Sequence, residues 1–395
     1  PLSGMLCHLT ILRQTAFITR WVSVINGKLL KKGKRIFSWH HWCGLIVGIF
    51  LLVMSISGSL LVFSDEIEGA YESNWTTVNN PSGAFFYDAS FSNIQKLYPG
   101  WEIRLYEQPH INEALVYDLR KGTALKKIFV HPVNGSILHV SDKVQNQLHR
   151  WLLSLHYTLF AGTAGKITVF FIGILFLVSL ITGIYIYRKA IVKVIFFRVR
   201  INKKSRRSLS SSLHRIIGVW TLVFNLLIVI TGLFISGNIA LAALKKATPA
   251  KANATGITSS IDKIKNEINQ QYPSFKIHLL RVSANSNIVQ LSGNFEDDPA
   301  YYGKYYSRFY FDGTTGQFQK KEWLREQGPF KKWQSMVAPL HFGNFGGLFL
   351  KFLYCLFGLM PGLLSITGFI IWRKRSKSLN QMQNRLVMAS RQPVL

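Results

Sequence analysis

Four long apolar runs divide the chain of 395 residues into alternating apolar and polar stretches. The runs cover approximately residues 42–63, 166–187, 216–237 and 348–372. A helix needs about 20 apolar residues to cross the hydrocarbon core of a bilayer, which is about 30 Å thick. Each run is long enough to do so. The pattern therefore predicts an integral membrane protein with four transmembrane helices.

The two longest polar stretches, which follow the first and third runs, resemble each other. In each, a helical pattern leads through a Tyr-Pro turn into short alternating strands. The predicted elements are the helices Ser90–Leu97 and Ile257–Gln271 and the strands Ile103–Tyr106, Ala114–Leu119, Ile128–His131, Ile277–Val282, Ile288–Leu291 and Tyr305–Phe311. Each half of the chain then consists of a helix, an α+β domain and a second helix. We predict a membrane all-α four-helix bundle with two α+β domains outside it and an internal two-fold repeat.

These patterns also set the domain boundaries that we predict. In chain order they are an N-terminal arm (1–35), a first transmembrane helix (36–64), a first α+β domain (65–147), an edge helix with the second transmembrane helix (148–188), a basic loop (189–213), a third transmembrane helix (214–238), a second α+β domain (239–337), an edge segment with the fourth transmembrane helix (338–373), and a tail (374–395).

The distribution of charge predicts the topology. Formal net charge is +29, and three stretches without any acidic residue, 1–38, 188–213 and 373–395, hold 22 of the 47 Lys and Arg residues. All 18 acidic residues fall in the two remaining extramembrane regions. The positive-inside rule then places both termini and the basic loop in the cytoplasm and both α+β domains outside. This alternation favours contact with membrane lipid and argues against nucleic acid as the partner of the basic stretches.

The cysteines and the N-terminal arm say little about fold or function. Cys7, Cys43 and Cys355 lie in the arm or in the apolar runs, so we expect no disulfide framework in the outside domains. The arm lacks the pattern of a cleavable signal peptide, and we expect either a helix on the inner membrane surface or an irregular extension.

Four histidines lie at the ends of the apolar runs in two matched pairs. His40 and His214 begin the first and third runs, each four residues before a glycine. His156 and His341 precede the second and fourth runs, each after a leucine and before a glycine cluster. A continuous helix from either of these two to the inner end of its run would exceed the membrane thickness. We therefore expect a helix break that leaves His156 and His341 at the outer surface.

Histidines at these positions suggest haem. Neutral imidazole is a common ligand of haem iron, and an ionisable group at membrane depth is a functional hypothesis by default. The two-fold repeat pairs His40 with His214 at the inner face and His156 with His341 at the outer face. Two imidazoles fill both axial positions of one iron, which favours electron transfer over oxygen chemistry. The alternative interpretation is four ordinary interfacial histidines.

Some neighbouring residues leave the ligand assignment open. His41 is adjacent to His40 and competes for the inner site, and His149, seven residues before His156, competes for the outer one. Arg150 and Arg215 each directly follow a histidine and are either partners of haem propionates or ordinary snorkelling residues. The hydroxyl–glycine dipeptides of the four runs are more typical of helix packing than of ligand binding; they are Ser57-Gly58, Thr182-Gly183, Thr231-Gly232 and Thr367-Gly368.

These motifs, with Tyr/Trp-Arg at the end of the second helices, occur in the same order in both halves, and Asp65-Glu66 follows the first run. Over about residues 36–375 the chain resembles the PepSY-associated transmembrane helix family, and within it the iron-regulated inner-membrane ferrisiderophore reductases. The resemblance implies two PepSY-like periplasmic domains and two b-type haems, the inner one held by His40 and His214 and the outer one by His156 and His341. It also implies reduction of ferric siderophore in the periplasm with release of Fe(II).

We accordingly predict an oxidoreductase of the bacterial inner membrane that reduces ferric siderophore. The cytoplasmic stretches are too short for a flavin or nicotinamide domain, so quinol or a partner protein is the expected electron donor. The four tyrosines at positions 301, 302, 305 and 306 form either part of a chelate-binding surface or ordinary strand packing. An iron or siderophore uptake transporter, or a haem-free PepSY-type binding or regulatory protein, are the alternative functions.

Overall fold

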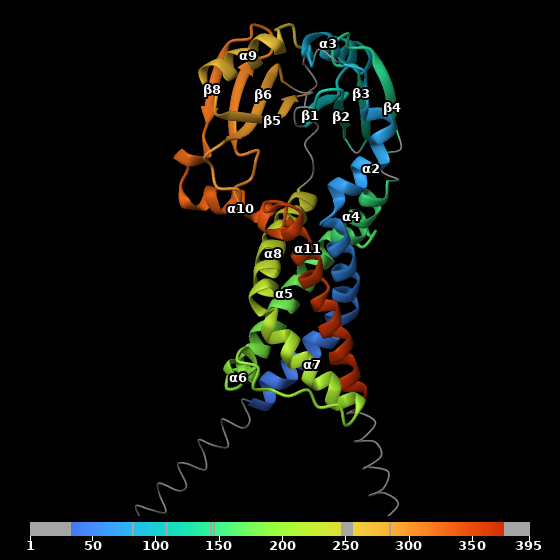
Figure 1. Cartoon of the computed structure of the whole chain (residues 1–395), viewed down its shortest axis with the longest axis vertical. Coiled ribbons are helices and arrows are strands. Elements are labelled where there is room, and N and C mark those ends of the chain that lie inside the picture. Colours follow the sequence, from blue (N-terminus) through green and yellow to red (C-terminus); the bar gives the residue numbers. More distant parts are fainter. Residues whose placement is uncertain are drawn as a thin grey trace, which may run out of the picture. The chain divides into compact units, whose positions relative to one another are not determined.

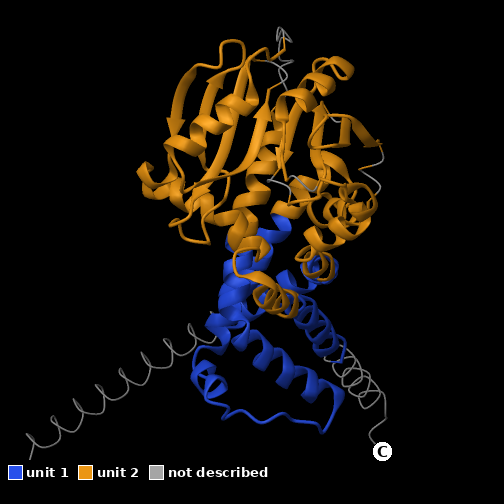
Figure 2. Ribbon diagram, turned by 45° about the horizontal axis from the view of Figure 1, so that its top comes forward, with its two compact units in different colours: residues 1–55, 171–230, 359–395 blue, residues 56–170, 231–358 orange. Residues whose placement is uncertain are grey.

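The computed structural model describes residues 33–80, 83–106, 110–122, 124–142, 144, 147–245, 256–283 and 286–374. The chain divides into two compact units (Figure 2). Unit 1 contains the residues up to 55, 171–230 and those from 359 onward, and unit 2 contains 56–170 and 231–358. Nearly all of the predicted N-terminal arm and C-terminal tail lie outside the described residues.

Four helices among the described residues are long and apolar enough to cross a membrane. They are Gly33–Leu61, α5 (Gly162–Tyr187), α8 (Leu222–Leu244) and Gly347–Lys374, whose first part is α11 (Gly347–Gly358). The shortest has 23 residues, which at a rise of about 1.5 Å per residue exceeds the thickness of the hydrocarbon core. The prediction of four membrane helices is confirmed.

Separate short helices precede the second and fourth membrane helices. α4 (Leu148–Thr158) ends at Leu159, which has a left-handed backbone with φ 49°, and α10 (Pro329–Phe342) ends at Gly343 with φ 71°. A left-handed residue terminates a helix because it redirects the chain, and glycine adopts this conformation without steric cost. The helix breaks that the sequence predicts after His156 and His341 are therefore present.

The third membrane segment differs from the single helix predicted over 214–238. α7 (Arg206–Trp220) ends at a turn residue, Thr221, and α8 begins directly after it. The Thr221 hydroxyl donates a hydrogen bond of 2.8 Å to the Ile217 carbonyl, one turn earlier in α7. Such bonds from a threonine back into its own helix often bend helices. His214 therefore lies on α7 rather than on the membrane helix itself.

Eight strands form one antiparallel sheet in unit 2 (Figure 1). Its order is β4-β3-β2-β1-β5-β6-β7-β8, so the pairing of β1 with β5 joins four strands from each of the two polar regions. The sequence analysis assigned these regions to separate domains and did not predict that they share a sheet. The strands are β1 (Glu102–Tyr106), β2 (Leu115–Lys121), β3 (Ala124–Val130), β4 (Ile137–Ser141), β5 (Phe275–Val282), β6 (Ile288–Phe295), β7 (Ser307–Asp312) and β8 (Phe318–Glu322).

Two helices, α3 (Tyr87–Leu97) and α9 (Ile261–Gln271), cover one face of this sheet (Figure 1). Their isoleucines, among them Ile94 and Ile264, pack in one core with alternate strand residues such as Ile103 and Leu280. Because side chains alternate between the two faces of a strand, the residues between these apolar positions point to the other face. That second face is largely polar, as the partly exposed Arg104 and Arg281 illustrate.

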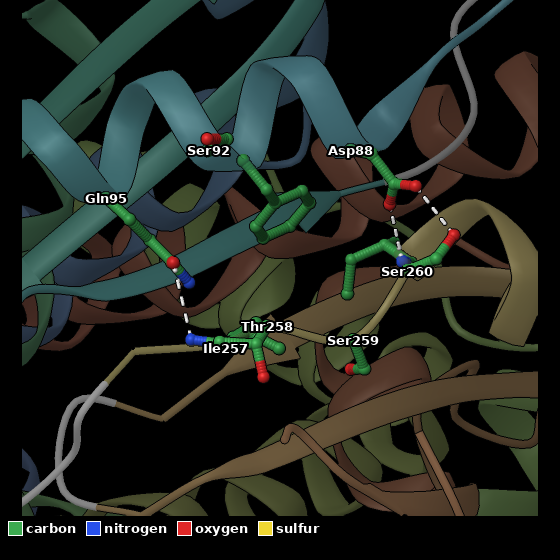
Figure 3. Close-up of a pocket in the computed structure, with 9 residues that line it drawn as sticks. Asp88, Ser92, Gln95, Ile257, Thr258, Ser259 and Ser260 are labelled. Carbon is green, nitrogen blue, oxygen red and sulfur yellow. Dashed lines mark hydrogen bonds between the residues drawn. The ribbon is translucent and has the colours of Figure 1, made fainter. Parts of the chain in front are cut away.

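The two covering helices cap each other. Asp88 at the start of α3 accepts hydrogen bonds from the Ser260 hydroxyl and from the Ile261 amide at the start of α9 (Figure 3). Asp262 in turn accepts hydrogen bonds from the backbone amides of Tyr87 and Asp88. Each carboxylate satisfies amides that a helix leaves free in its first turn and lies at the positive end of the partner's dipole. A pocket of about 370 Å³ adjoins this contact.

Candidate functional site

His40 and His214 are brought together in unit 1. Their ring centroids lie 6.3 Å apart, and the ring planes are nearly perpendicular at 82°. Bonds from histidine nitrogen to a metal are about 2 Å long. Two imidazoles on opposite sides of one metal therefore have ring centres roughly 6 Å apart. The sequence analysis predicted this pair, and the structure places its members at a separation that fits one shared metal.

Hydrogen bonds at Nδ1 fix the orientation of both rings. His40 Nδ1 lies 2.9 Å from the Ser179 carbonyl oxygen, which can only accept, so Nδ1 carries the proton. His214 Nδ1 lies 2.9 Å from the hydroxyl oxygen of Thr367, whose own proton is donated to the Leu363 carbonyl. Nδ1 of His214 is therefore a donor as well. Both imidazoles keep Nε2 as the nitrogen with a free lone pair, the arrangement that a partner at Nδ1 gives to metal-ligating histidines.

His156 and His341 lie in unit 2, on α4 and α10. His156 Nδ1 shares a hydrogen bond of 3.1 Å with the Ser57 hydroxyl, and His341 Nδ1 shares one of 3.0 Å with the Thr231 hydroxyl. Each ring is thus held through the same nitrogen and the same kind of partner as in the inner pair. That these two histidines serve one site together stays a prediction.

A glycine lies against each of the four rings. If a Cβ were added, it would be 2.8 Å from His156 Cε1 at Gly58 and 3.0 Å from His341 Cε1 at Gly232. The corresponding distances are 3.2 Å from His40 at Gly183 and 3.5 Å from His214 at Gly368. Only a residue without a side chain allows the closest of these approaches.

The hydroxyl residue that meets Nδ1 directly precedes this glycine in every case. Thr182 completes the set, because its hydroxyl lies 3.3 Å from His40 Nδ1. The sequence analysis assigned these dipeptides to helix packing and missed their relation to the histidines. Their recurrence with each of the four histidines was the signal that could have revealed it. We call each hydroxyl–glycine pair with its histidine an imidazole cradle.

The two competing histidines have other surroundings. His41 packs its ring edge against Trp42, with ring centroids 5.4 Å apart. His149 lies buried on α4, where its Nε2 is 3.6 Å from a carboxylate oxygen of Glu68. Neither lies in an imidazole cradle. The assignment of His149 as a cofactor ligand stays open, but its nearest charged neighbour is an acid rather than a second imidazole.

Glu68 belongs to a buried charged cluster that links α2 (Ser64–Thr76) to β3. The Lys127 ammonium donates hydrogen bonds of 2.5 Å to Glu68 and 2.7 Å to Glu72. Burial lowers the pKa of Lys127, but Glu68, Asp118 and Glu72 together outweigh it and hold that pKa above its usual value. Burial also lowers the pKa of His149, which is therefore neutral near pH 7. One ammonium is held between two carboxylates beside a neutral imidazole, so the cluster is built like a structural network.

Arg150 has an unmet hydrogen-bonding requirement. Its Nε is buried and has no hydrogen-bond partner among the described residues. A buried unpaired donor costs free energy, which a carboxylate ligand would recover. This observation fits the predicted interaction with a haem propionate, whereas Arg215 donates its Nε proton to the Ser211 carbonyl.

Comparison with known families now bears on this geometry. A family model for the PepSY-associated TM region matches residues 37–375. The chain belongs to this family. The matched range contains all four imidazole cradles and the entire eight-stranded sheet. A search of curated proteins found no match to the chain.

In this PepSY-associated TM protein, the ligand atoms that the cradles offer are imidazole nitrogens, and this limits which metal cofactor they can hold. Among the described residues, no group of three or more His, Cys, Asp or Glu side chains is placed to hold a metal ion. Two imidazoles alone complete the coordination of a metal whose other ligands come with it, as the four porphyrin nitrogens do in haem. The His40 and His214 pair, with Nε2 available on both rings, therefore fits haem iron.

Proposed function

We propose that this PepSY-associated TM protein is a dihaem b-type cytochrome that carries electrons across the bacterial inner membrane to ferric siderophore in the periplasm. The observation that carries the proposal is the separation of 6.3 Å between the His40 and His214 rings, with both Nδ1 atoms engaged as donors. The second pair, His156 and His341, repeats the same cradle. An internal two-fold repeat of the chain accounts for this fourfold recurrence.

The proposed chemistry divides between the haems and the protein. Haem held by two imidazoles of this chain would supply a one-electron carrier that does not bind oxygen. The chain's own residues hold and orient the imidazoles: the Ser179 carbonyl and Thr367 set the tautomer at the inner site, and Ser57 and Thr231 contact Nδ1 at the outer one. The sequence lacks a C-x-x-C-H motif, which favours non-covalent b-type haem over c-type.

The charge pattern gives the proposed direction. Under the positive-inside rule, the basic loop 189–213 is cytoplasmic and the sheet of unit 2 is periplasmic. His40 and His214 then serve the cytoplasmic side, and His156 and His341 the periplasmic side. A quinol releases two electrons and two protons, and its two electrons reduce two ferric ions one after the other. Hard oxygen ligands hold Fe(II) less tightly than Fe(III), so reduction loosens the chelate.

The visible spectrum of the purified protein tests the cofactor. We expect Soret and α bands and two haems per chain. His40→Ala and His214→Ala should each remove one haem, whereas His41→Ala, next to His40, should keep both. The same comparison of His156→Ala with His149→Ala tests the outer site. A protein without these bands, or with bands indifferent to the four ligand substitutions, would exclude the cytochrome and leave the haem-free regulatory protein.

Stopped-flow spectroscopy tests the reaction. The dithionite-reduced protein, freed of excess reductant, should reoxidise on addition of ferric siderophore, and an Fe(II) chelator should register one Fe(II) per haem oxidised. Bands of reduced haem that persist in the presence of ferric siderophore would contradict the reductase. Accumulation of iron inside proteoliposomes without haem oxidation would instead support the uptake transporter.

A further inference from the structure

A continuous row of polar side chains crosses the face of the sheet that α3 and α9 leave free. Strand register places each member directly opposite the next on the neighbouring strand, from β3 through to β8. The row consists of Lys127, Asp118, Arg104, Arg281, Gln290, Tyr310 and Lys320. No neighbouring pair in the row combines two like charges except the one at the centre, where the two halves of the sheet meet.

At that centre two arginines face each other. Arg104 of β1 and Arg281 of β5 are direct cross-strand partners. Like charges in this position destabilise a sheet, since their Cβ atoms lie only about 5 Å apart. Glu102 lies between them: one of its oxygens accepts from Arg104 Nε at 2.5 Å and the other from Arg281 at 2.6 Å. The trio itself holds one carboxylate and two guanidinium groups, while Asp118, opposite Arg104 on β2, lies 3.9 Å from Arg120.

Hydrogen-bond donors at this centre also remain unused. Arg281 donates from one terminal nitrogen to Glu102, while its Nε is buried without a partner among the described residues. A guanidinium offers five N–H donors in a planar fork that matches carboxylates and similar anions. Arg104 extends the site through a hydrogen bond of 3.0 Å to the Tyr106 hydroxyl. The side chains are reachable, since Arg104 is 21% and Arg281 36% exposed.

Aromatic rings border the arginine pair. Tyr106 meets Tyr305 edge to face, with ring centroids 6.1 Å apart, and Tyr305 keeps 37% of its surface exposed. Tyr305 is one of the tyrosines that the sequence analysis considered for a chelate-binding surface. Aromatic edges beside a charged fork suit a ligand that combines an anionic group with an organic framework.

We infer that Arg104 and Arg281, with Tyr106 and Tyr305 beside them, bind the anionic oxygens of the ferric chelate, so that the substrate class is negatively charged chelates such as carboxylate complexes. This inference rests on the proposed function for the identity of the ligand. In it Glu102 holds the two guanidinium groups together and competes with the ligand for them. A purely structural role for the trio, as an ionic link between β1 and β5, is the rival explanation.

Glu102 separates the two explanations. If the trio is an anion site, Glu102→Gln removes the competing charge and strengthens binding, whereas Arg104→Gln and Arg281→Gln weaken it. If the trio is only an ionic link, loss of any member destabilises the sheet and no chelate binding depends on it. Lys276→Gln is a matched control, because Lys276 is an exposed lysine on the same strand as Arg281 and its loss removes the same unit charge.

Calorimetric titration of the full-length protein in nanodiscs provides the test. Gallium(III) citrate is an anionic probe and gallium(III) desferrioxamine B a cationic one, and neither can be reduced, so binding is measured independently of haem. We expect the anionic probe to bind at least tenfold more tightly, with an affinity that falls as salt rises. Each arginine variant should lose roughly tenfold or more in affinity. Glu102→Gln should gain affinity, and Lys276→Gln should match the unmodified protein.

Each outcome has a definite consequence. Equal binding of both probes, no binding of either, or weaker binding by Glu102→Gln with a lowered melting temperature would overturn the anion site. A preparation without haem bands could still prefer the anionic probe, with variants that change affinity in the expected directions. That result would support the anion site while removing the proposed reductase. If the haem reoxidises normally in the variants and their probe affinity does not change, the reductase is kept and this site is excluded.

Discussion

The imidazole cradles predict graded effects of adding a single methyl group. Gly58→Ala places a Cβ 2.8 Å from His156 Cε1, whereas Gly368→Ala places one at 3.5 Å from His214 Cε1, already an ordinary contact. To reach an ordinary contact, the His156 ring must retreat by about 0.6 Å or more. The Ser57 hydroxyl bond at Nδ1 opposes that movement. We expect Gly58→Ala to disturb the outer haem and Gly368→Ala to leave the inner one intact.

Overpacking a tight contact costs about 1–3 kcal/mol, which lowers the ratio of bound to free haem roughly 5- to 150-fold. Gly232→Ala and Gly183→Ala provide intermediate points, with distances of 3.0 Å and 3.2 Å. Alanine raises intrinsic helix propensity by about 1 kcal/mol over glycine at all four positions, so this contribution largely cancels in the comparison. Haem loss should therefore follow the order Gly58, Gly232, Gly183, Gly368.

Pyridine haemochrome analysis gives haem per chain, and a redox titration resolves the two haems if their potentials differ. Far-UV circular dichroism of each variant checks that the helices are retained. Equal haem content in all four variants, or the greatest loss in Gly368→Ala, would refute the argument that steric fit against glycine positions the imidazoles.

Two further predictions concern stability, both read from thermal unfolding of the intact protein in detergent. Asp88→Ala removes the hydrogen bonds that Asp88 accepts from the start of α9 and should cost about 1–2 kcal/mol, lowering the melting temperature of the sheet unit by roughly 2–8 °C; an unchanged melting temperature would contradict the reciprocal capping. Burial lowers the pKa of Lys265 to about 8 from 10.5, with Asp262 partly opposing it. Between these values the unfolded chain binds more protons, so stability should rise with pH across this window. Lys265→Met should flatten that rise, and a slope unaffected by the substitution would count against it.

Helix breaks and membrane helices were predictable because their causes are local. A run of apolar residues long enough for a bilayer needs no knowledge of tertiary contacts, and a glycine such as Gly343 marks a chain reversal in the sequence itself. Strands β4 and β8 were not predicted, because the sequence analysis relied on alternating apolar residues to recognise strands. β8 reads Phe-Gln-Lys-Lys-Glu and is almost wholly exposed, so it lies at the sheet edge without an alternating apolar pattern.

The arrangement around the imidazoles was only partly predictable. Spacing within each run identified His40 and His214, but the partner of each ring comes from a segment far along the chain, Ser179 with Thr182 in one case and Thr367 in the other. A hydroxyl followed by glycine in an apolar run has an ordinary role in helix packing. Its recurrence with each histidine was the one sequence signal of their relation, and the position of the ring over the glycine shows that relation directly.

A site made of two imidazoles also constrains how the two halves of the chain must be connected. In the proposed cytochrome, each half supplies one histidine of the His40 and His214 pair, so a shared iron would require both halves at a fixed separation. Two independent extramembrane domains would leave the halves joined only by loops and membrane contacts. The β1–β5 pairing instead builds both halves into one sheet, with the Arg104, Glu102 and Arg281 trio at the junction. If chelate anions bind this trio, substrate is held where the halves meet, on the element that both share.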